Sequence, residues 1–329
     1  MTTARTVPVT TEMDGDELDA LDAWHLARHH GLGKIAVESF VRFRYGDGFT
    51  SSRALALQAC LAVVPFLLAL TGLASDIDRE RPAAVVAHVV DSLSPGSGDS
   101  DALASAVDDS DASELAGELA LVLGLGLALV SMTTAMAQVE RGANRIYGIR
   151  RDRKALHKYG RAAVLTAVLA APVGVGFVMI VGGGALGEAM AASYGWSDTA
   201  VDWWNGVRWP VGLALLVLAI AVLLDHAPRR RQPALSWLAL GSGIAVVLSG
   251  LATAGLAAYV SLSASFGSVY GPLAGVFALL LWALLSSVAF FYGTAVCAQL
   301  EALRAGEVAP VYDDPGRPHA KTVGDHVTG

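Results

Sequence analysis

The chain has 329 residues, of which 54% are hydrophobic and 16% are charged. A water-soluble globule usually carries about 25% charged residues, because a surface that lacks them associates and precipitates. The composition therefore excludes an ordinary soluble domain and indicates a membrane protein. The net charge of −7 says little by itself, because the charges are strongly segregated along the chain.

The residues before the first apolar run divide into two parts. Residues 1–20 are acidic around Asp14, Asp16 and Glu17 and lack an apolar core, which predicts a disordered N-terminus and not a cleaved secretory signal. Residues 21–53 interleave apolar and basic positions, which predicts an amphipathic helix. These positions are Leu26, Arg28, Leu32, Lys34, Ile35, Ala36, Phe40, Arg42, Phe43 and Arg44.

Two placements of this amphipathic segment remain open. In an interfacial placement, its arginines lie against anionic headgroups while Phe40 and Phe43 enter the acyl boundary. In the other placement, the segment is a cytoplasmic helix that packs beneath the membrane bundle. Its histidines His25 and His29 have the i, i+4 spacing of metal ligands, and His30 follows, but no carboxylate or further histidine completes a set. We therefore predict surface histidines, no metal site and no cofactor.

Six apolar stretches follow, each long enough to cross a hydrocarbon core of about 30 Å as a helix. Helix is the required structure, because a spanning backbone must satisfy its own hydrogen bonds and no stretch alternates like a barrel strand. The prediction is an all-α membrane bundle over residues 54–303. Its spans lie near 54–75, 117–138, 162–185, 209–225, 234–260 and 272–300.

The basic residues predict the orientation. Of the 23 Lys and Arg residues, 20 lie in four segments that share one side of the membrane. These segments are the one before the first span, the connection between the second and third spans, the connection between the fourth and fifth spans, and the tail. The remaining three are Arg79, Arg81 and Arg208. The positive-inside rule thus places both termini in the cytoplasm. Charged residues at the inner ends of the second and fourth spans, Glu140 with Arg141 and Asp225 with His226, are interpreted as anchors that water and headgroups can reach.

Two further segments are predicted to lie outside the bundle. The connection over 76–116 is acidic and external, and Val85, Val86, Val89 and Val90 form one helical face in it that could rest on the membrane or cap the bundle. The tail over 304–329 contains Pro310, Pro315 and Pro318 and is predicted to be disordered and cytoplasmic.

Small residues and one proline stand out within the spans. The fifth span carries a ladder of small side chains at every fourth position, which predicts a close helix interface within one chain or between two. Its members are Gly241, Ala245, Ser249, Thr253 and Ala257. Glycines of the third span serve the same purpose or soften that helix; they are Gly174, Gly176, Gly182, Gly183 and Gly184. Pro65 predicts a kink in the first span, and Cys60 and Cys297 are interpreted as packing residues.

Several segments together resemble the YihY/BrkB family of bacterial inner-membrane proteins. They are Ala59 to Leu68 around Pro65, the run Arg141 to Ile149, Trp209-Pro210, Ala227 to Arg230, Ala258 to Val260, Ser268 to Leu273, Leu281-Trp282 and Tyr292-Gly293. The resemblance covers residues 35–303 with the motifs in the family's order. It implies six spans with cytoplasmic termini, a location in the bacterial cytoplasmic membrane, and a part in envelope robustness.

The resemblance says less about activity. The family has been suspected of moving lipids, and its older ribonuclease label is regarded as mistaken. This chain also departs from the family pattern: an acidic residue of the last span is Ala295, nearby polar positions are Cys297 and Gln299, and first-span positions are Leu57, Gln58 and Ala62. Roles assigned to those groups elsewhere do not carry over to this sequence.

The chemistry-bearing residues favour a non-enzymatic function. No nucleophile with a base, paired carboxylates or metal set is recognisable. For a lipid or amphiphile, the candidate binding residues are Asn144, Arg145 and Tyr147 at the inner mouth of a groove, with Tyr259 and Tyr270 at the outer mouth. Each also has a structural interpretation, since asparagine caps turns and tyrosines populate the interfacial belt. The expected partners are membrane lipids, another membrane protein or a second copy, and no nucleic acid. A membrane scaffold without transport is the alternative, and a ribonuclease is the least favoured.

Overall fold

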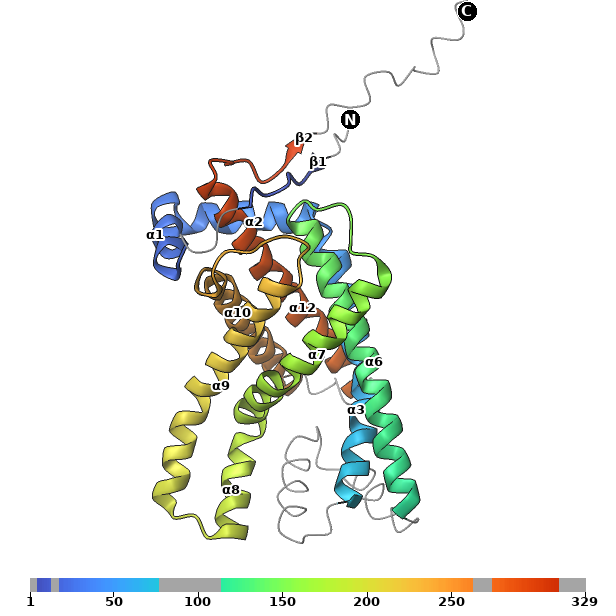
Figure 1. The fold of residues 1–329 in the computed structure, drawn as a ribbon. Coiled ribbons are helices and arrows are strands. Elements are labelled where there is room, and N and C mark those ends of the chain that lie inside the picture. The colour runs from blue at the N-terminus through green and yellow to red at the C-terminus, as the bar shows by residue number, and fades with distance from the viewer. Residues whose placement is uncertain (1–4, 13–17, 77–113, 263–273, 314–329) are drawn as a thin grey trace, which may run out of the picture.

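The computed structural model describes residues 5–12, 18–76, 114–262 and 274–313 (Figure 1). The described part is helical, apart from one antiparallel pairing between β1 (Arg5–Thr6) and β2 (Tyr312–Asp313). The all-α fold is therefore confirmed. We call the end of the bundle that carries β1, β2, α1 (Ala20–His30) and α2 (Leu32–Tyr45) the terminal end. The opposite end, where α8 (Gly183–Tyr194) meets α9 (Asp198–His226), is the distal end.

Five helices are long and apolar enough to cross a membrane, judged by length and composition within the described residues. They lie in α6 (Glu114–Ile146), in the run from α7 to α8, and in α9 (Asp198–His226), α10 (Leu235–Leu262) and α12 (Ala274–Arg304). The first predicted span falls on α3 (Gly48–Asp76), most of whose outer side chains lie outside the described set. The prediction of Val85 to Val90 as a helical face also lies outside the described residues.

The third apolar stretch is longer than predicted. One continuous helical run of 40 residues extends from Ala155 to Tyr194. It comprises α7 (Ala155–Phe177), the π-helical turn η3 (Val178–Gly182) and α8 (Gly183–Tyr194). A π turn inside an α-helix is rare and is often found at functional sites.

The N-terminal amphipathic segment forms two helices and not one. Asp19 caps α1 (Ala20–His30) by accepting hydrogen bonds from the backbone nitrogens of Leu21 and Asp22 at 2.8 and 2.9 Å. Gly31 then ends α1 with a φ of 98°, a conformation that favours glycine, and α2 (Leu32–Tyr45) begins directly after it.

The α2 helix packs on the protein along one face. It lies across the terminal end against α12 and α3 (Figure 1), and Ile35, Ser39, Arg42 and Phe43 are its buried residues. Of the two placements left open, the interfacial one has Phe43 in the acyl boundary; that part of it is wrong, because the Phe43 ring is fully buried and contacts Phe49 edge to face at 4.8 Å. Phe40 remains 46% exposed.

The densest apolar packing lies at the terminal end. One cluster joins α1, α2, α9, α10 and α12 around Trp237, and a second joins α2, α6 and α12 around Phe291; both side chains are fully buried. The spans themselves expose broad apolar faces, since between 11% and 28% of their most apolar windows are buried. Such faces suit a hydrocarbon solvent, in which exposed leucine carries no penalty.

The fifth-span ladder makes its closest contacts within the chain. A Cβ atom added at Gly241 would lie 2.5 Å from the carbonyl oxygen of Gly293, so α10 and α12 approach nearly backbone to backbone there. Ala245 is buried and faces Gly293, Ser249 is half-buried, and Thr253 accepts a hydrogen bond from Trp282 Nε1 of α12 at 3.0 Å. Ala257 at the outer end of the ladder is exposed.

Candidate functional site: a polar network at the terminal end

A buried cluster of charged and polar side chains joins the helices at the terminal end; we call it the terminal cluster. It contains Arg42 of α2, Tyr147 after α6, Arg230 between α9 and α10, and Glu301 of α12. Arg42 and Glu301 are fully buried, and the Arg230 side chain is 2% exposed. Arg230 Nη1 lies 2.7 Å from Glu301 Oε2, and the Tyr147 hydroxyl donates to Glu301 Oε1 at 3.2 Å. One carboxylate therefore connects three parts of the chain.

The Tyr147 ring adds a second contact to this ion pair. The Arg230 guanidinium lies over the ring, 4.6 Å from its centroid, which is cation–π geometry. Burial and the neighbouring charge of Glu301 raise the pKa of Tyr147 well above 10.0. The phenol therefore stays protonated and acts as a hydrogen-bond donor.

Arg42 is a buried cation held mainly by neutral oxygens. Its Nε donates to the carbonyl of Ile146 at 3.0 Å, and Nη1 donates to Gln299 Oε1 at 3.2 Å. Its Nη2 donates to the carbonyl of Pro8 at 3.3 Å and to the hydroxyl of Thr10. Burial lowers the pKa of Arg42 to about 10, against the opposing effect of Glu301, so the group remains protonated at neutral pH.

The N-terminal segment covers this cluster. The Thr10 backbone nitrogen donates to the carbonyl of Tyr147 at 3.1 Å, and Arg230 Nη2 donates to the carbonyl of Thr11 at 3.2 Å. The prediction of disorder over 1–20 is therefore wrong for residues 5–12, and the same holds for the start of the tail, where β2 pairs with β1. The reason is physical: these segments are ordered by distant partners and not by their own composition.

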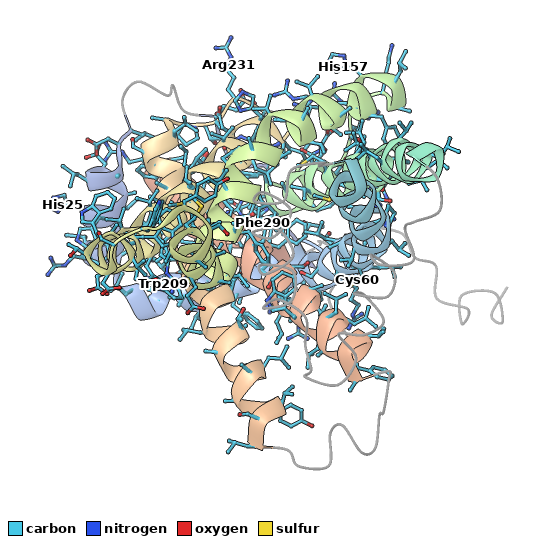
Figure 2. The ribbon with its side chains drawn as sticks, turned by 90° about the horizontal axis from the view of Figure 1, so that it is seen from below. His25, Cys60, His157, Trp209, Arg231 and Phe290 are labelled. Carbon is cyan, nitrogen blue, oxygen red and sulfur yellow. The ribbon has the colours of Figure 1, made fainter. Side chains whose placement is uncertain are left out.

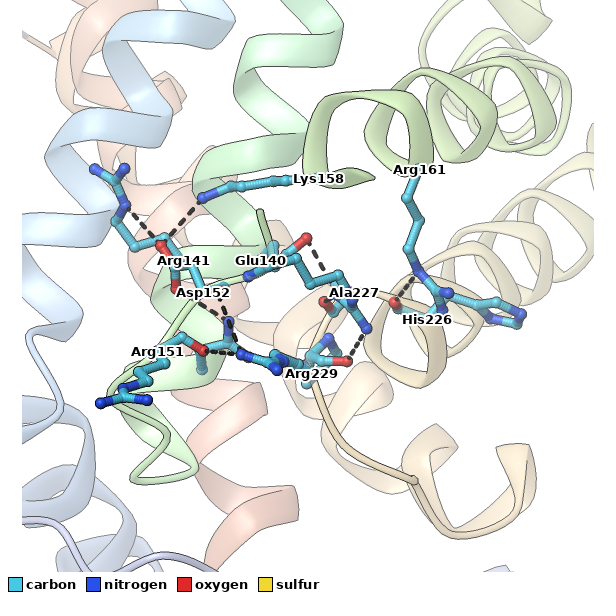
Figure 3. Close-up of polar contacts among 12 residues, drawn as sticks. Glu140, Arg141, Arg151, Asp152, Lys158, Arg161, His226, Ala227 and Arg229 are labelled. Carbon is cyan, nitrogen blue, oxygen red and sulfur yellow. Dashed lines mark hydrogen bonds and ion pairs between the residues drawn. The ribbon is translucent and has the colours of Figure 1, made fainter. Parts of the chain in front are cut away.

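A second group, the loop network, fixes the connection between α6 and α7 (Figure 3). Asn144 Nδ2 donates to Asp152 Oδ1 at 3.2 Å, and Asn144 Oδ1 accepts from the Arg229 backbone nitrogen at 2.8 Å. Lys158 Nζ and Arg141 Nε lie 3.2 and 3.4 Å from Asp152 Oδ2. Both ends of the Asn144 amide are thus engaged in holding two loops together.

The same loop network binds the end of α9. Arg153 donates to the carbonyls of Ala227 and Pro228, both at 2.8 Å, and pairs with Glu140 at 3.1 Å. Carbonyls at a helix end carry partial negative charge, which a guanidinium stabilises. Glu140 is 4% exposed, so the prediction that water and headgroups reach it is wrong.

Asp152 allows a test of the loop network by pH. Burial by itself would raise the pKa of Asp152, but the hydrogen bond from Asn144 and the charge of Lys158 outweigh it, so the pKa lies below its ordinary 3.8. A carboxyl group whose pKa is depressed in the folded state stabilises the fold above pH 3.8, and this contribution is lost as the pH falls through the folded-state pKa.

We expect Asp152→Asn to lower the unfolding temperature at neutral pH. Below pH 3.8 the unfolding temperature of this variant should decrease less steeply than that of the wild type. Thermal scans in detergent over pH would measure this, with exposed Asp202→Asn as the control; equal pH profiles for both variants would contradict it.

Comparison with known proteins agrees with the sequence motifs. The family model described as virulence factor BrkB matches residues 39–313. The chain belongs to the BrkB family. A ribonuclease-like protein named YfkH, from Bacillus subtilis (strain 168), is 24% identical over 263 residues, which cover 80% of this chain and 94% of that protein. No solved structure matches the chain.

The inner candidate residues of this BrkB-family chain separate into two kinds. Asn144 and Tyr147 are fully buried and have the structural partners described above. Arg145 is exposed in the last turn of α6. Tyr259 is 55% exposed near the outer end of α10, and Tyr270 lies outside the described residues. Asn144 is therefore a member of the loop network and Tyr147 a member of the terminal cluster, whereas Arg145 faces outward.

The remaining singled-out residues have simpler surroundings. The α3 helix continues through Pro65. Cys297 is fully buried beside Gly241, and Cys60 is half-buried. Within the described residues no group of three or more His, Cys, Asp or Glu is placed to hold a metal ion. His30 instead lies 3.1 Å from Glu38.

Sequence reasoning missed the principal members of the terminal cluster. Arg42 follows Ile35 by seven positions and Ser39 by three, so it shares the buried face of α2. Glu301 follows Cys297 by four positions on the buried side of α12. A charge on the apolar face of an amphipathic helix was the available signal, whereas Arg230 lies outside the helices and offered no periodicity.

Proposed function

We propose that this chain is a non-enzymatic protein of the bacterial cytoplasmic membrane that binds and moves lipids, or another amphiphile with an anionic headgroup, in envelope maintenance. It crosses the membrane six times with both termini inside. The family membership and the five apolar helices support a multi-pass membrane protein; the handling of amphiphiles rests on the observation in the next paragraph.

That observation is an exposed basic rim at the terminal end. Its members are Arg145, Arg150, Arg151, Lys154 and His157, all exposed, and Figure 2 shows His157 and Arg231 reaching outward at the edge of the molecule. The rim begins at the end of α6, a membrane-length helix, where lipid phosphates are expected to lie. A basic rim at this end is also what the positive-inside rule requires of a cytoplasmic face.

The buried network supports this proposal indirectly. The charged side chains of the terminal cluster pair within that cluster, and those of the loop network pair within the loop network. Among the inner candidates, Arg145 is the exposed one, and its guanidinium is directed outward. The ribonuclease-like name of the Bacillus subtilis relative suggests RNA cleavage instead. A metal-dependent ribonuclease needs a carboxylate and histidine set to hold its ions and activate water, and no group of three or more such residues is placed to hold a metal ion in the described part of the chain. We therefore place lipids ahead of RNA as the expected ligand.

The first test is lipid movement in proteoliposomes that contain the purified chain. Labelled phospholipids of several classes would be followed, with an inactive membrane protein as reference and vesicle integrity verified. We expect the chain to accelerate movement and Arg145→Ala to slow it about fivefold, because one basic residue near the surface contributes about 1 kcal/mol. Arg145→Lys, which keeps the positive charge, is the control and should leave the rate close to that of the wild type.

Each outcome has a clear meaning. Unchanged movement in a folded Arg145→Ala variant would remove Arg145 from the site. No acceleration by the wild-type chain in any lipid class would favour the alternative, a membrane scaffold that holds a partner helix or a second copy. The ladder contacts lie largely within the chain, so such a partner would have to bind the exposed outer faces of the spans.

A further inference from the structure

Arg208 lies within a spanning helix and not in a loop. It belongs to α9, which has 29 residues and is therefore about 43 Å long, more than the roughly 30 Å of a hydrocarbon core. The terminal end of α9 carries Asp225 and His226. Counting about 20 residues back from Asp225 reaches the neighbourhood of residue 205, so Arg208 lies at the distal boundary of the hydrocarbon. The predicted spans over 162–185 and 209–225 had placed it instead in the outer connection between them.

Tryptophans mark the same level. Four of the seven tryptophans in the chain are Trp196, Trp203, Trp204 and Trp209. Trp203 is 69% exposed and Trp209 is 47% exposed, and Figure 2, viewed from the distal end, shows Trp209 on α9. Tryptophan collects at the headgroup level of a bilayer. Arg208 thus lies at the depth where lipid phosphates are found.

The Arg208 guanidinium is seated on a glycine surface. A Cβ atom added at Gly183 would lie 2.9 Å from Arg208 Cδ and 3.2 Å from Nη1, and one at Gly184 would lie 3.4 Å from Nη1. These glycines directly follow the π turn η3, and Trp204 Nε1 donates to the carbonyl of Gly183 at 2.6 Å. The glycines therefore leave the space that the arginine occupies.

The polar atoms of this seat lack protein partners. Arg208 Nε is buried and has no hydrogen-bond partner in the described part of the chain, and the same is true of Asn205 Oδ1. Arg208 lies 5.3 Å from the centroid of Trp209, a contact that uses its charge but none of its donors. Asn205 precedes Arg208 by three positions, so both side chains share one face of α9. One buried donor and one buried acceptor, each without a partner among the described residues, thus lie on the same face of α9.

An unsatisfied charged donor at the membrane boundary is costly, and ionisable groups within spans are usually functional. A phosphodiester supplies what is missing, because a guanidinium can donate two parallel hydrogen bonds to phosphate oxygens. We propose that Arg208 and Asn205 form a phospholipid headgroup site at the distal end. Arg208 binds the phosphate, and Asn205 Oδ1 accepts a hydrogen bond from an ammonium or hydroxyl of the headgroup. This site rests on the proposed lipid-binding function, since it supplies a headgroup contact in the leaflet opposite Arg145.

Binding can be tested separately from movement. The full chain in detergent would be titrated with dioleoyl phosphatidylethanolamine or phosphatidylglycerol, with dioleoylglycerol as the probe that lacks phosphate, and bound lipid would be counted by native mass spectrometry. A phosphatidylethanolamine with a photoreactive headgroup would map the contact. We expect Arg208→Gln to weaken the tightest phospholipid binding about tenfold and to remove crosslinks around residues 205–209. Arg231→Gln, at the terminal end, should leave those crosslinks intact.

Two further measurements keep the proposal falsifiable. Asn205→Leu retains the arginine and should reduce the preference for phosphatidylethanolamine over phosphatidic acid. Equal binding of dioleoylglycerol, unchanged binding in Arg208→Gln, or displacement of the lipid by an equal concentration of inorganic phosphate would overturn the assignment. If binding requires Arg208 but the wild-type chain moves no lipid, the headgroup site is supported and the transport proposal fails. If the chain moves lipid but binding is the same with and without Arg208, transport is supported and the headgroup site fails.

Discussion

Replacing Arg230 by alanine is expected to lower the thermal unfolding midpoint by roughly 10 °C. The substitution leaves Glu301 buried without its ion-pair partner, 2.7 Å away in the wild type, and removes the cation stacked on Tyr147. Breaking a buried pair on one side typically costs about 3–5 kcal/mol in the free energy of unfolding. Thermal scans of the purified variants in detergent would measure the effect.

The neighbouring residue provides a matched control. Arg231 has the same charge and lies on the same connection, but it is exposed. Arg231→Ala should therefore change the midpoint little. If both alanine variants unfold at the wild-type temperature, the terminal cluster does not stabilise the fold as its geometry implies.

Replacing Gly241 by alanine is expected to destabilise the contact between α10 and α12. The added methyl group would lie 2.5 Å from the carbonyl oxygen of Gly293 and would also meet Cys297 Sγ. The carbonyl is backbone and cannot rotate away, so the helices must separate. Overpacking of this kind costs about 1–3 kcal/mol and occasionally more.

Gly243 on the same helix gives a control with the opposite sign. A Cβ atom there would meet nothing within 4 Å, so Gly243→Ala gains helix propensity, worth up to about 1 kcal/mol, without a clash. The yield of folded protein and the unfolding midpoint should fall for Gly241→Ala and hold or rise for Gly243→Ala. The same direction of change in both variants would argue against a close α10–α12 crossing.

The terminal cluster and the distal seat of Arg208 treat arginine in different ways. At the terminal end, Arg42 and Arg153 direct their donors to oxygen atoms of the chain itself, and Arg230 pairs with Glu301, although its Nε also lacks a hydrogen-bond partner among the described residues. At the distal end, Arg208 rests on glycines and a tryptophan and leaves Nε unmatched among the described residues. The first arrangement holds helices together, and the second is the seat of the proposed phosphate site.

The sequence by itself determined the membrane class and most of the helix positions. A run of about 20 apolar residues has few alternatives to a helix in lipid, so its position can be read without knowledge of any partner. The ladder on α10 also follows from periodicity alone. The extension of the third run to Tyr194 does not follow from periodicity. Its glycines Gly183 and Gly187 pack against Arg208 and Trp204 of another helix, and these contacts exist only in the folded chain.

Only the tertiary structure decided which polar residues are buried and with what. Arg42 meets Gln299 across 257 positions, and Tyr147 meets Glu301 across 154. No local pattern encodes such pairs, since the burial of each charge depends on the arrival of a distant partner that compensates its loss of hydration. For the same reason the sequence grouped Asn144, Arg145 and Tyr147 together as candidates, whereas the fold buries two of them and exposes Arg145.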